Sequence, residues 1–186
     1  MPSDWAPTLS HRIDEMISTY PALLALKDGL GNSLTYLQME QRVHSIATSL
    51  LTCDVELGSK IAVFQEPTVD WICSLVAILR IGCVYVPLDL RNPLERLSAN
   101  VQAAQPSAIL ADSATMSNTS GLHYGSARCI DVSAIRNCLS SHLQPICNRA
   151  CPKSPAVILF TSGTSKFESH KLSVSLDHQP CWDKVF

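Results

Sequence analysis

The sequence lacks the features that mark several large classes of protein. Charged residues fill only 16% and aromatic residues only 6% of its 186 positions, and no run of Lys or Arg occurs. Because phosphates are bound by clustered basic side chains, a chain with a formal charge of -2 and no such cluster is not expected to bind nucleic acid. The 46% of hydrophobic residues excludes a disordered chain and is enough for about one packed domain.

Motifs for metal binding and for hydrolases are also missing. The eight cysteines include no Cys-x-x-Cys pair and the six histidines form no His-Glu-x-x-His pattern, so no metal ligands are predicted. Ser162 does not stand in a Gly-x-Ser-x-Gly elbow. Charged residues within the first sixteen positions leave no apolar signal-peptide core, which favours a cytoplasmic protein with free thiols.

The one candidate for a membrane span is the apolar stretch from Trp71 to Leu88. Asp70 borders this stretch, Arg80 interrupts it and Pro87 closes it before the length of a transmembrane helix is reached. We therefore expect no membrane partner.

Short apolar runs alternate with helical spacings through much of the chain, and each run predicts a strand that is buried on both faces. The predicted strands are Ile61–Phe64, Cys83–Val86, Ala108–Ala111, Cys129–Val132 and Val157–Phe160. Helices are predicted between the first three, one capped by Thr68 and ended by Gly82, the other begun by Pro93. Parallel strands need such crossovers, so we predict an α/β fold, a partial three-layer sandwich with a mostly parallel sheet covered by helices.

The remaining segments give weaker patterns. Helical spacing of apolar residues follows Leu9, a hairpin is predicted over residues 22–34, and Thr35 can cap a helix that extends to Leu50. The polar residues 113–126 predict a surface loop. Residues 166–186 show no clear period and are not expected to continue the sheet.

The strongest chemical signal is the segment after the last apolar run. Val157–Phe160 continues directly into Thr161, Ser162, Gly163, Thr164 and Ser165. Hydroxyl groups and backbone N–H groups in such a loop can donate to a phosphate, and the glycine lets the backbone approach closely. The loop is not a Walker A motif, which requires Gly-x-x-x-x-Gly-Lys-Ser/Thr, and the same composition also occurs in ordinary surface loops.

Three motifs in order resemble the opening part of the adenylation (AMP-binding) domains of nonribosomal peptide synthetases, in the adenylate-forming superfamily. Leu34-Thr35-Tyr36 is similar to the first core motif of these domains, residues 79–89 (LRIGCVYVPLD) to the second, and residues 159–165 (LFTSGTS) to the start of the third, the phosphate-binding loop. Pro93 with Glu95-Arg96-Leu97 resembles a further segment of these domains, written PxeRL. The residues YVPLD of the second motif favour the peptide-synthetase branch, including its hybrids with polyketide synthases.

The resemblance implies a function for the family as a whole. The complete domain activates an amino acid with ATP, as Mg-ATP, to an aminoacyl-adenylate and pyrophosphate, and then loads it onto a carrier-protein thiol. It also implies that Thr161, Ser162, Gly163, Thr164 and Ser165 contact the ATP phosphates. The second motif is mainly scaffold in this comparison, and we interpret its Asp89 as a turn cap rather than a functional residue.

The sequence departs from the family within the third motif. After Ser165 the family has Gly, a spacer and Pro-Lys-Gly, whereas this chain has residues 166–171 (KFESHK), so no phosphate-binding lysine and no catalytic residue is assigned. We therefore expect residues 1–165 to be the N-terminal part of a truncated adenylation domain and 166–186 to be a divergent, poorly ordered tail. A frameshift, a retained intron or a broken gene would explain the change.

Two main functions remain open at this point. The chain is either an adenylation-domain fragment that is inactive by itself, or an interaction module that docks as a split half on a complementary synthetase chain or a carrier protein. An incomplete sheet would expose an edge and apolar surface that need a cover. A third reading, an abbreviated acyl-CoA ligase, lacks a catalytic lysine. The sequence does not identify the amino acid or acyl substrate.

Overall fold

The computed structural model describes residues 8–137 and 146–160, and the backbone of residues 173–177. Its helices are α1 (Leu9–Thr19), α2 (Tyr36–Leu51), α3 (Val69–Arg80) and α4 (Leu94–Ala104), with the short 3-10 helices η1 (Met116–Leu122) and η2 (Val132–Ala134). Its strands are β1 (Leu24–Lys27), β2 (Ser33–Thr35), β3 (Lys60–Phe64), β4 (Val84–Pro87), β5 (Ala108–Ala111), β6 (Arg128–Asp131), β7 (Pro155–Phe160) and β8 (Ser173–Asp177). Over the residues described, no helix is long and apolar enough to span a membrane.

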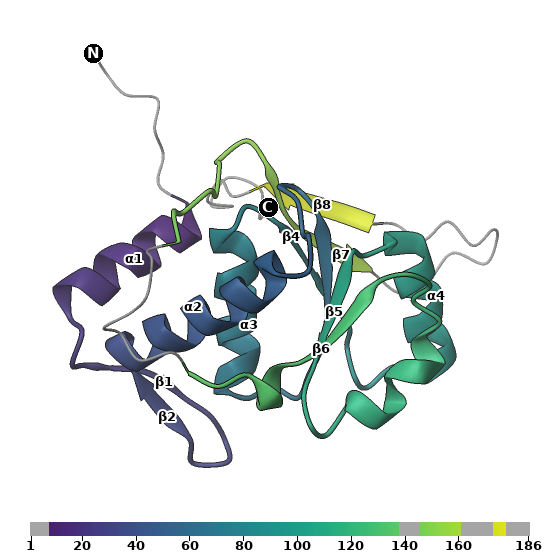
Figure 1. Ribbon diagram of the computed structural model, residues 1–186, viewed down its shortest axis with the longest axis horizontal. Helices are drawn as coiled ribbons and strands as arrows, with labels where there is room; N and C mark the ends of the chain where they lie inside the picture. Colours follow the sequence, from purple (N-terminus) through teal and green to yellow (C-terminus); the bar gives the residue numbers. More distant parts are fainter. Residues whose placement is uncertain (1–7, 138–145, 161–172, 178–186) are drawn as a thin grey trace, which may run out of the picture.

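One six-stranded sheet with the order β6-β5-β3-β4-β7-β8 organises the molecule (Figure 1). The first five strands in this order are mutually parallel, and β8 runs antiparallel to β7. The strands β1 and β2 form a separate antiparallel hairpin. This arrangement confirms the predicted α/β class with a mostly parallel sheet.

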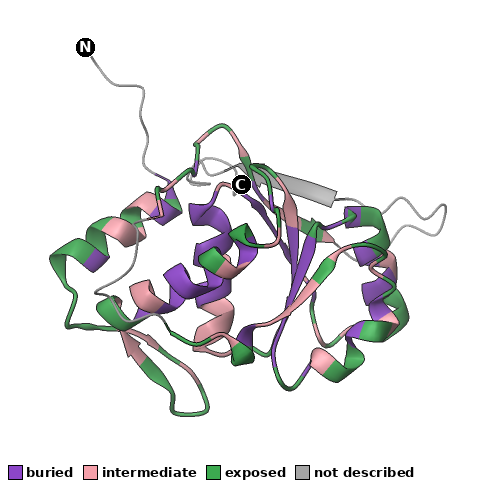
Figure 2. Ribbon diagram, viewed as in Figure 1, coloured by how far each residue is buried: buried purple, intermediate pink, exposed green. Residues whose placement is uncertain are grey.

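Helices cover both faces of the sheet and make three layers. The helices α1, α2 and α3 lie on one side, and α4 with η1 lies on the other (Figure 1). The connection from β3 to β4 moves in one direction along the sheet and the connection from β4 to β5 moves back, so right-handed crossovers require α3 and α4 on opposite faces. Buried residues concentrate in the strands and on the inner sides of the helices (Figure 2).

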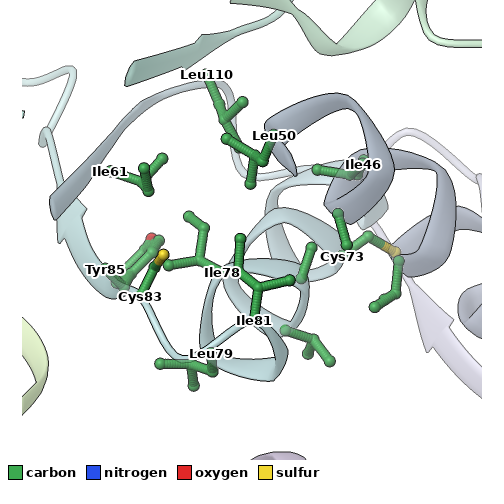
Figure 3. Close-up of a cluster of buried hydrophobic side chains, with 14 of the residues drawn as sticks. Ile46, Leu50, Ile61, Cys73, Ile78, Leu79, Ile81, Cys83, Tyr85 and Leu110 are labelled. Carbon is green, nitrogen blue, oxygen red and sulfur yellow. The ribbon is translucent and has the colours of Figure 1, made fainter. Parts of the chain in front are cut away.

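The larger of two apolar clusters lies between α2, α3 and the sheet. Ile46 and Leu50 of α2 meet Ile78 of α3, with Ile61 and Leu110 contributed by the strands (Figure 3). The second cluster, on the other face, consists of Ala62, Phe64, Leu88, Leu97, Val101, Ile109 and Leu122. β3 thus sends alternate side chains into the two clusters, which explains why its sequence is apolar throughout.

Two local features follow directly from the sequence. Thr35 and Gln38 form a capping box at the start of α2, since each side chain bonds to the backbone of the other residue. Gly82 follows α3 with a φ of +74°, a conformation that favours glycine. A Cβ atom at Gly82 would lie 2.4 Å from Cδ1 of Leu57 and 3.0 Å from the carbonyl oxygen of Arg149, so the chain also passes close by.

Partly buried ionic contacts join the helices to one another and to a distant loop. Asp14 of α1 forms an ion pair with Arg80 of α3 and accepts a hydrogen bond of 2.7 Å from Nδ2 of Asn148. Arg42 of α2 forms an ion pair with Asp70 of α3 through two bonds of 2.7 Å. These pairs fix α1 and α2 against α3, which itself packs on the sheet.

The structure corrects three details of the sequence-based expectation. Residues 113–126 are not only a loop, because Met116–Leu122 forms η1, whose Leu122 is fully buried under α4. Thr68 does stand at the N-cap of α3, but its side chain makes no capping hydrogen bond. The segment 173–177, within the expected tail, adds β8 to the sheet because strand pairing needs backbone groups and no particular side-chain pattern.

Candidate functional site

The carboxyl ends of β3 and β4 form the point where the sheet reverses its direction of winding. The chain leaves β3 toward α3 on one face, whereas it leaves β4 toward α4 on the other. In doubly wound sheets the crevice between two such loops is the usual ligand site. The candidate site is therefore this carboxyl edge, defined here by residues 65–68, 88–92 and 112–115 and by the end of β7 at Phe160.

β7 reaches the same edge. Tyr85 of β4 pairs with Val157 of β7, and continuing this parallel register by three residues brings Phe160 level with Leu88. The backbone N–H of Leu88 also bonds to the carbonyl of Val63 in β3, at 2.9 Å. The last residues of three adjacent strands thus lie together, and the chain leaves β7 next to the reversal point.

Asp112, at the end of β5, is fully engaged in fixing this edge. Its Oδ2 accepts a bond of 2.7 Å from the N–H of Glu66, and its Oδ1 accepts bonds of 3.0 and 2.9 Å from the N–H groups of Ala114 and Thr115. The hydroxyl of Thr115 donates to the carbonyl of Phe64. Asp112 therefore ties the loop after β3 to the loop after β5, and it is not free to act as a base.

Asp89, just after β4, forms a turn. It accepts hydrogen bonds from the backbone N–H of Arg91 at 3.1 Å and from the guanidinium of the same residue at 2.9 and 2.8 Å. These bonds from Arg91 hold the pKa of the Asp89 carboxyl at about 2. The predicted role of Asp89 as a turn cap is confirmed.

Gln65 is the one residue of this edge whose side chain is buried without a hydrogen-bond partner among the residues described. The residue is only 3% exposed, and neither Oε1 nor Nε2 of its carboxamide is bonded. Buried polar groups nearly always have partners, so an unpartnered carboxamide needs an explanation. The sequence patterns did not single out Gln65 as a functional residue; the available signal was a polar residue directly after a buried strand.

The predicted phosphate-binding residues Thr161, Ser162, Gly163, Thr164 and Ser165 lie outside the described residues. The structure describes the strand that leads to them, which ends at Phe160 on the carboxyl edge. The other motifs lie within the described part and are scaffold. The first caps α2, the second spans the end of α3 and the whole of β4, and Pro93 stands at the N-cap of α4.

Six of the eight cysteines are within the described residues, and all six are free thiols. Burial raises the pKa of Cys73 to about 12 and that of Cys83 to about 11, so neither thiol ionises near neutral pH. Cys151 is exposed, and hydrogen bonds from the backbone of Lys153 and from Ser154 lower its pKa. In the described part of the chain no three metal-ligating side chains come together.

An open groove of about 440 Å³ lies beside α4 and η1. Its lining residues are Leu94, Glu95, Ser98, Ala99, Gln102, Gly121 and His123. None of them is among the residues that define the carboxyl edge.

The sheet reverses its direction of winding between β3 and β4, its carboxyl edge is polar, and β7 ends at this edge directly before the hydroxyl-rich segment of the sequence. These features define a doubly wound α/β domain with a ligand site at the strand ends. The family model described as AMP-binding enzyme matches residues 13–165. The chain therefore belongs to the AMP-binding enzyme family and contains the N-terminal part of its domain.

Curated relatives include fungal hybrid PKS-NRPS synthetases. The chain is 52% identical over 162 residues to the hybrid PKS-NRPS synthetase mpsA of Macrophomina phaseolina. The aligned part is 87% of this chain and 4% of the relative. It is 47% identical over 163 residues to thnA of Trichoderma harzianum and 44% identical over 163 residues to the equisetin synthetase eqxS of Fusarium heterosporum. The chain thus spans about 4% of the length of these relatives.

Solved structures show the same fold at low identity. The N-terminal subdomain of NpsA from Klebsiella oxytoca superimposes with a TM-score of 0.73 at 21% identity, over 92% of this chain and 42% of that one. ATP-bound MatB from Rhodopseudomonas palustris gives a TM-score of 0.74 at 21% identity, over 92% of this chain and 35% of that one. These matches confirm the predicted fold, an α/β sandwich with a mostly parallel sheet that is covered by helices.

Proposed function

We propose that the chain carries the phosphate-binding part of an adenylation site, that it binds Mg-ATP weakly, and that it does not form an adenylate by itself. The observation that carries this proposal is the position of β7. Its carboxyl end lies beside the reversal point of the sheet, and the sequence continues from there into Thr161–Ser165. In the hybrid synthetases the complete domain would activate an amino acid, and this chain would supply one side of that site.

The proposed chemistry uses hydrogen-bond donors. Hydroxyl groups of Thr161, Ser162, Thr164 and Ser165, with the backbone N–H groups of the same segment, would donate to phosphate oxygens, and Gly163 would permit close approach. Attack of a carboxylate oxygen on the α-phosphorus of ATP, with pyrophosphate as the leaving group, requires charge stabilisation from preorganised groups on several sides of the phosphates. The chain has no lysine at the position that the family pattern requires, which supports binding without turnover.

The test is an equilibrium titration of the 186-residue chain with Mg-ATP, accompanied by an amino-acid-dependent pyrophosphate-exchange assay. We expect weak, saturable binding that falls at least about tenfold in the double variant Thr164→Val/Ser165→Ala, because two bonds to a charged acceptor are lost. The exposed Ser126→Ala, in a different loop, is the matched control. Binding that is unaffected by the double variant would refute the phosphate site, and exchange above background would refute the inactivity.

A second function, docking to the complementary part of an adenylation domain, is favoured by the exposure of β7. Every residue of β5 is buried, yet β7, an inner strand, buries only Ala156, and its Leu159 is 37% exposed. An inner strand with uncovered apolar side chains indicates that further protein packs here. The relatives supply a source, because the matched part is only about 4% of the length of each.

The docking test mixes the chain with the remaining part of the adenylation domain of a hybrid synthetase relative and follows the complex by size-exclusion chromatography. Leu159→Lys should abolish the complex because it places a charge in the apolar contact. Leu30→Lys, at the 79% exposed tip of the hairpin, should leave it intact. Failure to form a complex, or equal effects of both variants, would refute this docking; a carrier protein is the other partner to be tested in the same way.

We further propose a cytoplasmic location. The six free thiols of the described residues support it, since pairs of exposed cysteines oxidise readily in secretory compartments.

A further inference from the structure

Two sulfur atoms meet where η1 lies against β6. The thiol of Cys129 on β6 lies 3.7 Å from Sδ of Met116 on η1. Side chains alternate along a strand, and Ile130 packs against the larger apolar cluster, so Cys129 faces the other side of the sheet, which η1 covers. Within the described part of the sheet β6 is an outer strand, and Cys129 and Met116 are only partly buried. The pair of sulfur atoms can therefore be reached from solvent.

Hydrogen bonds hold Met116 in place. Its backbone N–H donates to the carbonyl of Asp112 at 2.8 Å, and its carbonyl accepts a bond of 2.8 Å from the hydroxyl of Thr119. The hydroxyl of Thr119 also lies close to the thiol of Cys129. A thiol, a thioether and a hydroxyl oxygen thus come together from two elements, and the backbone of Met116 is fixed before any ligand arrives.

The two sulfur ligands restrict which ion can bind between them. Mg²⁺ and Ca²⁺ prefer oxygen ligands, and structural zinc sites take four ligands from Cys, His, Asp and Glu. Over the residues described, no three side chains of these four types come together. Monovalent copper, Cu(I), is a soft ion that binds both thiolate and thioether sulfur. One thiolate also neutralises its single charge, which suits a half-buried position because an unpaired charge there is costly.

We propose that Cys129 and Met116 form a binding site for Cu(I), with the hydroxyl of Thr119 as a weak third ligand. On binding, the S–H bond of Cys129 breaks, its proton passes to solvent, and the electron pair of the sulfur forms the bond to copper, so nothing is oxidised or reduced. With metal–sulfur bonds of about 2.3 Å, the length found for zinc thiolates, one cation contacts both sulfur atoms at their present separation, at an angle of about 107°. The proposal is independent of the proposed function, because none of the three residues belongs to the carboxyl edge.

The test is NMR of the full chain with ¹³C-labelled methionine methyl groups. The chain has four methionines, and the Met116 resonance is identified by its loss in Met116→Leu, which keeps a similar volume. We expect a stoichiometric amount of Cu(I), kept reduced with ascorbate in the absence of oxygen, to shift this resonance and to leave those of Met16 and Met39 in place. A Cu(I) chelator should reverse the shift, which distinguishes coordination from oxidation of the thioether. Zn²⁺ should cause no shift.

Two thiol variants decide whether Cys129 is part of the site. Cys129→Ser should abolish the shift, whereas Cys151→Ser, which removes an exposed thiol elsewhere, should leave it intact. No shift of Met116 in the wild type, or the same shift in Cys129→Ser, would overturn the proposal and leave the sulfur atoms as a packing contact. An equal shift with Zn²⁺ would overturn the selection of Cu(I).

A second measurement does not depend on the folding of Cys129→Ser. Cu(I) should protect Cys129 from alkylation in the wild type, because the thiolate is bound to the metal, and much less in Met116→Leu, which lacks the second sulfur ligand. The alkylated fraction is measured by peptide mass spectrometry. Equal protection of Cys129 in the two proteins would show that Met116 is not a ligand.

Discussion

The contact between Arg42 and Asp70 allows a quantitative test of how this fold is held together. All five N–H groups of the Arg42 guanidinium have acceptors, two of them on Asp70. The others donate to the carbonyls of Ile135 at 2.6 Å and Val132 at 2.8 Å and to Oδ1 of Asn137 at 3.1 Å. One side chain of α2 thus joins α3 to the segment after β6, with sequence separations of 28 to 95 residues.

Substitution Arg42→Met removes these bonds and leaves the acceptors without a donor. The Arg42 side chain is 8% exposed and that of Asp70 is 27% exposed, so the released carboxylate can be partly rehydrated. Breaking a fully buried pair costs about 3–5 kcal/mol, and the partial exposure of Asp70 favours the lower end, about 3 kcal/mol. This is a large part of the roughly 5–15 kcal/mol that stabilises a typical domain.

The assay is urea unfolding followed by circular dichroism. With a slope of about 2 kcal/mol per M, a loss of about 3 kcal/mol lowers the unfolding midpoint by about 1.5 M. Arg12→Met is the control, because Arg12 also pairs with a carboxylate, on Glu15, but both side chains are more than half exposed. Such a surface pair contributes less than about 0.5 kcal/mol. Equal midpoints for the two variants would refute the reasoning that burial and full use of the guanidinium give Arg42 its weight.

Two further predictions concern the backbone and the thiols. Gly82→Ala should lower the melting temperature by several degrees, because an L side chain strains the positive φ and meets the close contacts described above. Gly29→Ala, with open space around its Cβ position, is the control and should have little effect. Equal melting temperatures for the two variants would contradict this prediction. The protein is alkylated in its native state at pH 7.5 and analysed by peptide mass spectrometry. Cys151 should react first, because its pKa is lowered, whereas Cys73 and Cys83 should react only after unfolding, because burial raises their pKa to about 12 and about 11. Early labelling of either buried thiol would show that this core opens readily.

Local patterns in the sequence predicted most of the elements correctly. The apolar run Ala108–Ala111 coincides with β5, and Thr35 begins α2 with the capping box that its spacing to Gln38 permits. The prediction failed where tertiary contacts decide the local structure. A polar loop was predicted for residues 113–126, but η1 forms there because Leu122 is buried against α4. Short segments of this kind follow the packing of their surroundings more than their own composition.

The sequence by itself determined most of the strands and helices, the hydroxyl-rich segment Thr161–Ser165 and the resemblance to adenylation domains, because these depend on periodicity and on motifs within a few residues. Only the tertiary structure decided the order of the strands, the engagement of Asp112 by the loop after β3, and the burial of the Gln65 carboxamide without a partner among the described residues. Strand order and hydrogen-bond partners join residues that are far apart in the chain, since they arise from packing two helical layers onto one sheet. Whether the carboxamide of Gln65 had a partner therefore became visible only once β3, β4 and β5 lay side by side.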